Sequence, residues 1–295
     1  MRIGYPCMNT VVGCTSARTF RLKSWNEERF HSTVAENLTC LSRILAFNAE
    51  HNLLFFRITS DLVPFASHPV NTLDWAEVFA EEFAGIGACV RDHNIRISMH
   101  PDQFTLLTSP DEGVCERSGA ELAYHAVVLD AMGLDTTAKV QVHLGGVYGD
   151  REAAVGRFLD RYRDFPADVR RRLVVENDDR LYTEAECRAV GRECGVPVLF
   201  DVFHHECNPS SLGTGAAVAA CAATWKEKDG VPMVDYSSQE PGERRGRHAR
   251  TLDPTHFATF LAAARPHDPD IMLEIKDKEQ SALRALEIAR EGDLS

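Results

Sequence analysis

The feature that most constrains this chain is a short apolar run that recurs eight times, each time followed by a segment with helical periodicity. Each run has the length of a buried strand and is rich in Val, Ile, Leu or Phe. The runs cover residues 2–5, 53–59, 95–99, 139–142, 172–175, 197–200, 231–234 and 271–273. Parallel neighbours in a sheet need a crossover connection, usually a helix, so this alternation predicts a parallel sheet.

The segments between the runs complete the pattern. We expect helices over residues 25–52, 72–93, 111–134, 150–162, 183–194, 211–225, 254–264 and 278–290. Two of them begin with clear signals: Thr183 and Glu186 form a capping box, and Asp253 precedes Pro254 as an N-cap. The 295 residues suffice for one large α/β barrel or two smaller domains. Eight regular units favour one (β/α)8 TIM barrel over residues 1–295, with a doubly wound open sheet as the alternative.

Composition narrows the class of protein. No stretch is apolar enough to span a membrane and no signal-peptide pattern is present, so we expect a cytoplasmic protein. The net charge of −12 argues against a nucleic-acid partner, but basic residues cluster locally and can steer a polyanion; this cluster contains Arg244, Arg245 and Arg247. Nine cysteines without a C-x-x-C pair predict that most of them are reduced core thiols and that there is no disulfide framework. Cys207 is a candidate ligand, although a buried bystander is the favoured interpretation.

Most of the strand-like runs end in a residue that can bind a metal ion. Asp201 ends the run at 197–200, and His204 follows three residues later. The strand ends and the loops after them supply His68, His100, His143, Glu176, Asp201, His204, Asp235, His248 and Glu274. In a (β/α)8 barrel these side chains would converge at the C-terminal mouth, where unpaired carboxylates repel one another. Divalent cations with neutral imidazoles relieve that repulsion, so we predict a metal site there.

The number of candidate ligands predicts two or three ions, with Glu176 bridging a pair. Such a pair is typical of in-line displacement at phosphorus, and the mixed shell suits Zn²⁺ or Mn²⁺. We find no activated Ser or Cys nucleophile and no Gly-rich phosphate loop. Gln103 and Phe104 follow His100 closely and could contact or stack on nucleobases, although core packing is the plainer interpretation of an aromatic residue. Tyr5 would face the same mouth.

Several longer motifs occur in order along nearly the whole chain. They are Gly4-Tyr5 with Asn9, Phe56–Leu62 with His68, His100-Pro-Asp-Gln-Phe104, Val142-His143, Glu176-Asn-Asp178, Asp201–His205, Tyr236–Ser238 with Gly246–His248, and Met272–Lys276. With these motifs the chain resembles the UV damage endonuclease family. The strand-end acids alone would also fit the AP endonuclease and sugar isomerase barrels.

The resemblance implies a (β/α)8 barrel with a manganese site, for which Zn²⁺ or Mg²⁺ would be substitutes. It implies an enzyme that nicks double-stranded DNA immediately 5′ to UV photoproducts (pyrimidine dimers and 6-4 photoproducts), leaving a 3′-hydroxyl and a 5′-phosphate. We expect this enzyme to be a monomer. The implied metal ligands are His100, His143, Glu176, Asp201, His204, His248 and Glu274. Glu176 and His68 would take part in catalysis. By the same resemblance, Tyr5, Asn9, Gln103 and Phe104 would contact DNA or the lesion. From their local charge, we expect Arg244, Arg245 and Arg247 to form part of the DNA path.

One departure from the family pattern concerns the seventh strand. The family often has a Lys and a His where this chain has Met233 and Asp235. Asp235 could still bind metal through oxygen, whereas Met233 cannot replace a lysine. Two alternatives therefore stay open beside the endonuclease: an AP endonuclease-like or sugar isomerase-like metal enzyme, and a damage-binding barrel without catalysis.

Overall fold

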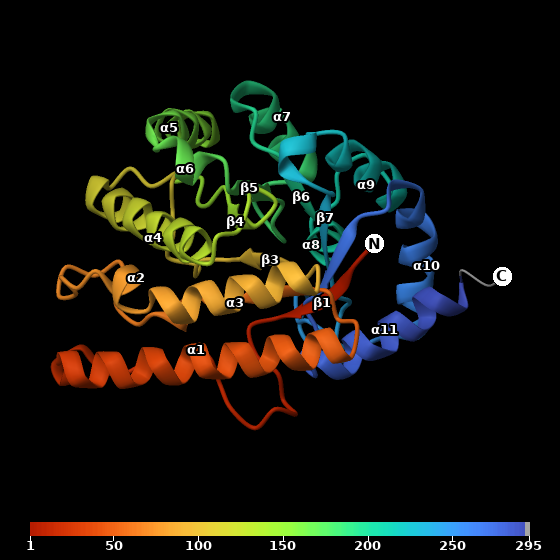
Figure 1. The fold of residues 1–295 in the computed structure, drawn as a ribbon. Helices are drawn as coiled ribbons and strands as arrows, with labels where there is room; N and C mark the ends of the chain where they lie inside the picture. Colours follow the sequence, from red (N-terminus) through yellow and green to blue (C-terminus); the bar gives the residue numbers. More distant parts are fainter. Residues whose placement is uncertain (293–295) are drawn as a thin grey trace.

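The computed structural model describes residues 1–292, and its eight strands form a closed parallel barrel in sequence order (Figure 1). The strands are β1 (Ile3–Pro6), β2 (Phe55–Ile58), β3 (Arg96–Met99), β4 (Lys139–His143), β5 (Leu173–Glu176), β6 (Val198–Asp201), β7 (Met233–Tyr236) and β8 (Asp270–Leu273). The predicted (β/α)8 barrel is confirmed, and the open sheet is excluded because β1 pairs with both β2 and β8.

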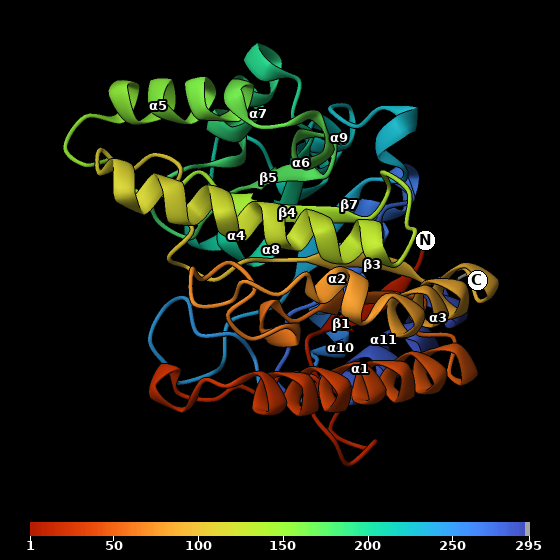
Figure 2. The ribbon, with the colours of Figure 1, turned by 60° about the vertical axis from the view of Figure 1, so that its left-hand side comes forward.

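Helices surround this barrel. They are α1 (Glu27–Glu50), α2 (Trp75–Val78), α3 (Ala80–Asp92), α4 (Glu112–Ala131), α5 (Arg151–Asp164), α6 (Ala167–Arg170), α7 (Glu184–Cys194), α8 (Val202–Cys207), α9 (Thr214–Ala222), α10 (Pro254–Ala264) and α11 (Glu279–Glu291). Figure 2 shows α1, α3 and α4 lying side by side over the first strands. Both predicted helix starts are present, the capping box at Thr183 and the Asp253 cap before Pro254. In residues 1–292 no helix is long and apolar enough to cross a membrane.

Two local details differ from the prediction. The single helix expected over residues 72–93 is two helices, because Phe79 between them leaves helical geometry at φ −110° and ψ 26° while its ring stays buried. The loop expected after β6 is instead the short helix α8. Its N-cap is Asp201, whose side chain accepts a hydrogen bond from the His204 backbone N–H at 2.6 Å.

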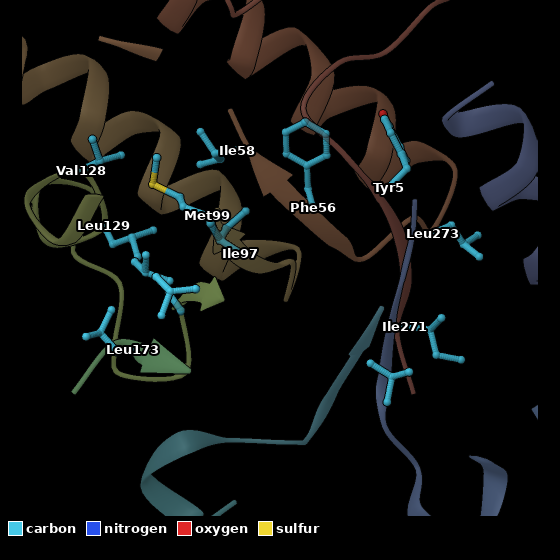
Figure 3. Packing of buried hydrophobic residues seen from close by; sticks show 14 of the residues in the cluster. Tyr5, Phe56, Ile58, Ile97, Met99, Val128, Leu129, Leu173, Ile271 and Leu273 are labelled. Atoms are coloured by element: carbon cyan, nitrogen blue, oxygen red, sulfur yellow. The ribbon is translucent and has the colours of Figure 1, made fainter. Parts of the chain in front are cut away.

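The strand register decides which side chains face the barrel interior. Successive side chains of a strand point to opposite faces, and paired residues of neighbouring strands point to the same face. The register joins His143 to Glu176 and Asp201 to Asp235, with Glu176 opposite Leu199. The intervening positions form the layer between barrel and helices, where Tyr5, Phe56, Ile97, Ile271 and Leu273 pack (Figure 3). The strand-end residues that point to the interior of the barrel therefore bring their polar groups close together there.

The N-terminal end of the barrel is filled by paired charges. Arg96 donates to Asp270 at 2.9 Å, and Lys139 donates to Asp229 at 2.7 Å. Above them an interior layer contains Phe55, Val174, Leu199, Met233 and Met272. The barrel is thus closed below by ion pairs and apolar side chains, and its upper end holds the predicted site.

Most of the cysteines are reduced, as predicted, but one pair forms a disulfide that the sequence does not predict. Cys14 and Cys40 form a disulfide that joins the loop after β1 to α1. The other seven cysteines are free thiols, including Cys207, which belongs to neither group of candidate metal ligands in residues 1–292. Cysteine spacing alone does not indicate a bridge across 26 residues, because the pairing depends on how the loop packs against the helix.

Candidate metal centre

Glu176 lies at the centre of the site, buried at the C-terminal end of β5. Its two carboxylate oxygens face different partners. Oε2 lies 3.3 Å from His100 Nε2 and 3.8 Å from His143 Nε2, whereas Oε1 lies 3.3 Å from His204 Nδ1. One carboxylate is therefore shared between two sets of imidazoles.

Asp201 completes the second set. Its Oδ2 lies 3.6 Å from His204 Nδ1 and has no hydrogen-bond partner within residues 1–292, although the residue is fully buried. Asn177 holds this residue from the neighbouring strand end: its side chain donates to the Asp201 carbonyl and accepts from the Asp201 N–H, both at 2.9 Å. The unpaired oxygen is thus fixed in place beside Glu176 and His204.

Within residues 1–292, two groups of side chains have ligand atoms close enough to hold a metal ion. The first contains His100, His143 and Glu176, and the second contains Glu176, Asp201 and His204; within each group the ligand atoms lie within 4.8 Å of one another. Both groups offer imidazole nitrogen and carboxylate oxygen, a donor set that suits Zn²⁺ or Mn²⁺. The buried, unpartnered Oδ2 of Asp201 fits the same interpretation, since such an atom costs free energy unless it is satisfied.

The buried carboxylates and imidazoles of the site shift one another's pKa values in both directions. Burial raises the pKa of Asp201 well above its usual value, and the carboxylates of Glu176 and Glu274 add to this effect. Burial also raises the pKa of Asp235, to about 7. Burial opposes the charge on His204, but Asp201 and Glu176 outweigh it and raise the pKa of that imidazole to about 11. Burial also opposes the ionised forms of Glu176 and Glu274, but His143 and the other histidines lower the pKa of Glu176, and Arg57 lowers that of Glu274 to about 2. Asp201 and Asp235 therefore favour the protonated form, whereas Glu176 and Glu274 stay ionised.

His248 and Glu274 lie next to these two groups. His248 Nδ1 is 3.0 Å from the Glu274 carbonyl and 3.8 Å from its Oε2, and the His248 ring centroid is 6.2 Å from that of His204. The ring centroids of His100, His143 and His204 are spaced 5.3 and 5.5 Å apart. Seven of the predicted ligands thus surround one region of the barrel mouth.

Asp235, the eighth predicted ligand, has different neighbours. Its Oδ2 accepts hydrogen bonds from Arg57 Nη2 at 2.5 Å and from Gln141 Nε2 at 2.7 Å, and it belongs to neither metal-ligand group of the described chain. Gln141 also donates to Glu176 Oε2 at 2.8 Å, and Arg57 forms a second ion pair with Glu274. Sequence reasoning missed Arg57 and Gln141 as site residues, although strand parity puts them on the interior face.

Tyr5 does not face the mouth. It lies on the outer face of β1, fully buried, with its ring packed edge-on against Phe56. Its hydroxyl donates to Asn48 Oδ1 at 2.6 Å and accepts from Asn9 Nδ2 at 2.8 Å. The prediction that Tyr5 lines a lesion pocket is corrected by this position. Asn9 is also buried, and its Oδ1 accepts from the N–H groups of Val11 and Val12.

His68 is not brought into the cluster. It is exposed on the loop after β2, where its Nδ1 accepts from the Val70 N–H and its ring contacts Phe65. Neither contact leads to the metal-ligand groups found in residues 1–292.

The predicted DNA-contacting side chains of the later loops are accessible. Phe104 is 71% exposed, the highest value for a large apolar side chain among the described residues, and Gln103 beside it is exposed. Arg244, Arg245 and Arg247 are exposed on the loop after β7, which leads directly into His248. These side chains are therefore accessible to a ligand at the same end of the barrel, and Arg245 also donates to the backbone carbonyl of Cys207.

Comparison with known proteins identifies the family. The model of the UV-endonuclease UvdE family matches residues 1–294. This chain belongs to the UvdE family. A UV DNA damage endonuclease of Clostridium perfringens (strain 13 / Type A) is 33% identical over 293 residues, covering 99% of this chain and 71% of the relative. The crystal structure of SacUVDE matches with a TM-score of 0.95 and 39% identity, covering 99% of both chains.

More distant structures share the fold alone. Endonuclease IV from Thermus thermophilus matches with a TM-score of 0.56 and 19% identity, over 85% of this chain and 93% of its own length.

As a member of the UvdE family, this chain is assigned to the nucleases of DNA repair. The expected resemblance is thereby confirmed.

Proposed function

We propose that this UvdE-family protein is a metal-dependent endonuclease that nicks duplex DNA immediately 5′ to UV photoproducts and leaves a 3′-hydroxyl and a 5′-phosphate. The observation that carries the proposal is the position of Glu176, whose two oxygens serve two ligand groups at the barrel mouth. A bridging carboxylate between paired ions is the arrangement used for displacement at phosphorus.

The chain's own residues would build this centre as follows. His100 and His143 would hold one Mn²⁺ with Glu176 Oε2, and Asp201 and His204 would hold a second with Glu176 Oε1. Glu274 and His248 would complete the shell from the neighbouring loops, and Zn²⁺ or Mg²⁺ would be substitutes. When bound, the ions would supply a hydroxide at neutral pH and neutralise the charge of the scissile phosphodiester.

Recognition would come from loops beside the centre. Phe104 would insert into or stack within the duplex, and Gln103 would hydrogen-bond to base edges. A photoproduct weakens pairing and stacking, so flipping a damaged dinucleotide costs less than flipping intact bases. Arg244, Arg245 and Arg247 would contact phosphates, a local attraction that the net charge of −12 does not provide.

Two of the predicted residues would act less directly than Glu176. Asn9 would act on DNA only through the loop that it holds, since its side chain is buried and hydrogen-bonded to the local backbone. His68, which is exposed, would reach the phosphodiester only if DNA binding brought its loop toward the centre. We assign the main catalytic role to Glu176.

A nicking assay on supercoiled plasmid tests the function. The purified protein with Mn²⁺ is expected to relax UV-irradiated plasmid, to leave unirradiated plasmid intact, and to lose activity in EDTA. A plasmid carrying abasic sites is the matched control for an AP endonuclease. Equal cutting of the irradiated plasmid and the abasic plasmid would contradict selectivity for photoproducts. Binding of irradiated DNA without any nick would show a damage-binding barrel. Absence of both DNA binding and nicking would favour the sugar isomerase alternative.

A further inference from the structure

A tyrosine and an arginine beside the barrel mouth form a pair that the proposed centre does not use. Tyr148 lies in the loop after β4, shortly beyond His143, and is 44% exposed. Arg157 lies on α5, with its Cζ 5.9 Å from the centre of the Tyr148 ring. An arginine over an aromatic ring at this distance makes a cation–π contact, so the two side chains are held together at the surface.

The loop after β4 is shaped around the ring of Tyr148. This residue has φ +49°, in the left-handed region that is unfavourable for a bulky side chain. A Cβ atom added to Gly146 would lie 2.9 Å from the ring and displace it. Strained backbone of this kind is concentrated at binding and active sites, where the surrounding structure holds a group in place for its ligand. The loop thus keeps an exposed ring in a fixed position.

The charge of Arg157 has no carboxylate partner within residues 1–292. Its Nε donates to the Thr108 carbonyl at 2.7 Å, and its two terminal amino groups lack a hydrogen-bond partner in this part of the chain. Arg163, on the same helix, instead pairs with Asp160. On a chain with a net charge of −12, a half-buried guanidinium that is fixed but not neutralised points to an anion from outside the protein.

The pair lies next to the loop that carries Phe104. Thr108 belongs to that loop, and a Cβ atom added to Gly145 would lie 2.7 Å from its Oγ1, so the loops after β3 and β4 are in contact. Figure 2 shows α4 and α5, which follow these loops, beginning at the same end of the barrel. Tyr148 and Arg157 therefore extend the surface on which the proposed function places the duplex.

We propose that Tyr148 and Arg157 together bind one backbone phosphate of the duplex, beside the lesion. The inference rests on the proposed function, because it requires DNA to cover this end of the barrel. The planar guanidinium presents its amino groups to the phosphate oxygens. The Tyr148 hydroxyl, which has no hydrogen-bond partner within residues 1–292, donates to the same phosphate. Because a phosphate contact positions DNA without reading its bases, the pair fixes the duplex while the loop of Phe104 tests for damage.

The test is the salt dependence of DNA binding, measured by fluorescence anisotropy on an intact and a UV-irradiated duplex in EDTA, which is expected to stop nicking. The logarithm of the binding constant falls linearly with the logarithm of the salt concentration, and loss of one phosphate contact reduces the slope by about 1. Arg157→Gln should show this reduction and should weaken binding to both duplexes by the same factor. Arg157→Lys keeps the charge and should keep the slope. Arg163→Gln removes an exposed, paired arginine of the same helix, and as the matched control it should bind like the native protein.

Tyr148→Phe should weaken binding to both duplexes by about 2–10-fold, the loss expected for one hydrogen bond, with an unchanged slope. This variant decides the question if Arg157→Gln does not fold, and native affinity in it would overturn the shared contact. An unchanged slope in Arg157→Gln, or an equal reduction in Arg163→Gln, would overturn the inference, as would a loss confined to the irradiated duplex. If the native protein nicks irradiated plasmid while Arg157→Gln binds DNA normally, this inference alone is refuted. A native protein that binds neither duplex and does not nick would refute the proposed function as well.

Discussion

Charged side chains are buried at both ends of the barrel, and the two sets differ in how their charges are balanced. At the N-terminal end, Asp270 accepts from Arg96 and from Arg2, and Lys139 donates to Asp229. Each buried carboxylate there has a basic partner. This end needs no further ion to satisfy its charges.

The C-terminal end is acidic. Glu176, Asp201, Asp235 and Glu274 are gathered there, and Arg57 is the only arginine or lysine of residues 1–292 that forms an ion pair with any of them. Histidines contact the remaining carboxylates, and burial raises the pKa of Asp201 and Asp235. An excess of buried negative charge destabilises a protein unless a cation compensates it. The comparison therefore separates an end that is complete without ligands from one that is built to receive cations.

The largest effect is expected for Glu176→Gln. The amide cannot serve both ligand groups as an anion. Loss of groups that only support metal ligands already changes affinity or activity by about 10–100-fold, so loss of the shared carboxylate should reduce nicking by more than about 100-fold. Glu184→Gln, a buried glutamate on α7, is the matched control and should keep activity. Full nicking by Glu176→Gln would remove the basis of the two-group site.

At the opposite end, Asp270→Ala should act on stability and not on chemistry. It leaves the buried Arg96 without its carboxylate, a change that costs about 3–5 kcal/mol. The melting temperature should fall by about 2–4 °C for each kcal/mol. Nicking per folded molecule, measured well below that temperature, should stay at the native level. A specific loss of nicking would contradict the division of the barrel into a structural and a functional end.

Features of the fold and the site that depend on short stretches of sequence could be predicted, whereas features that depend on contacts between distant residues could not. The strand-ending His, Asp and Glu residues could be predicted to converge, because the barrel follows from local strand and helix patterns and places all strand ends together. Tyr5 was misplaced because a shift of one residue along a strand turns a side chain to the other face. The register that decides this is set by pairing with other strands.

The partners of Arg57 and Gln141 could not be foreseen for a different reason. Arg57 and Asp235 are 178 residues apart, and Gln141 and Asp235 are 94 apart. Which interior side chains meet depends on the barrel's closure and on side-chain length, and no local pattern records either. The Cys14–Cys40 disulfide escaped prediction likewise, since it joins a loop to a helix packed against it.

Removal of the metal ions should have an effect of intermediate size, and this effect tests the difference between the two ends of the barrel. A ligand present at about 100 times its dissociation constant stabilises the folded state by about 2.7 kcal/mol. We expect Mn²⁺, compared with EDTA, to raise the melting temperature of the native protein, and Asp270→Ala to keep the same increment because the two ends act independently. Glu176→Gln should lose most of it. If the rise in melting temperature with Mn²⁺ disappeared in Asp270→Ala and persisted in Glu176→Gln, the ion would bind at the N-terminal end of the barrel, contrary to this prediction.

The smallest effect is expected from the loop beside the rim. Phe104 and Val231 are both exposed apolar side chains, one near the rim and one before β7 at the other end. Stacking on a base contributes about 1–3 kcal/mol, so the double variant Gln103→Ala with Phe104→Ala should lose about 10–100-fold of the preference for irradiated over intact duplex. Competition binding with both duplexes measures this, and the bound Mn²⁺ should not change. Val231→Ala should leave the preference as it is, since its surface lies away from the proposed DNA path. An equal loss in both variants would mean that the exposed ring at the rim is not a probe of the lesion.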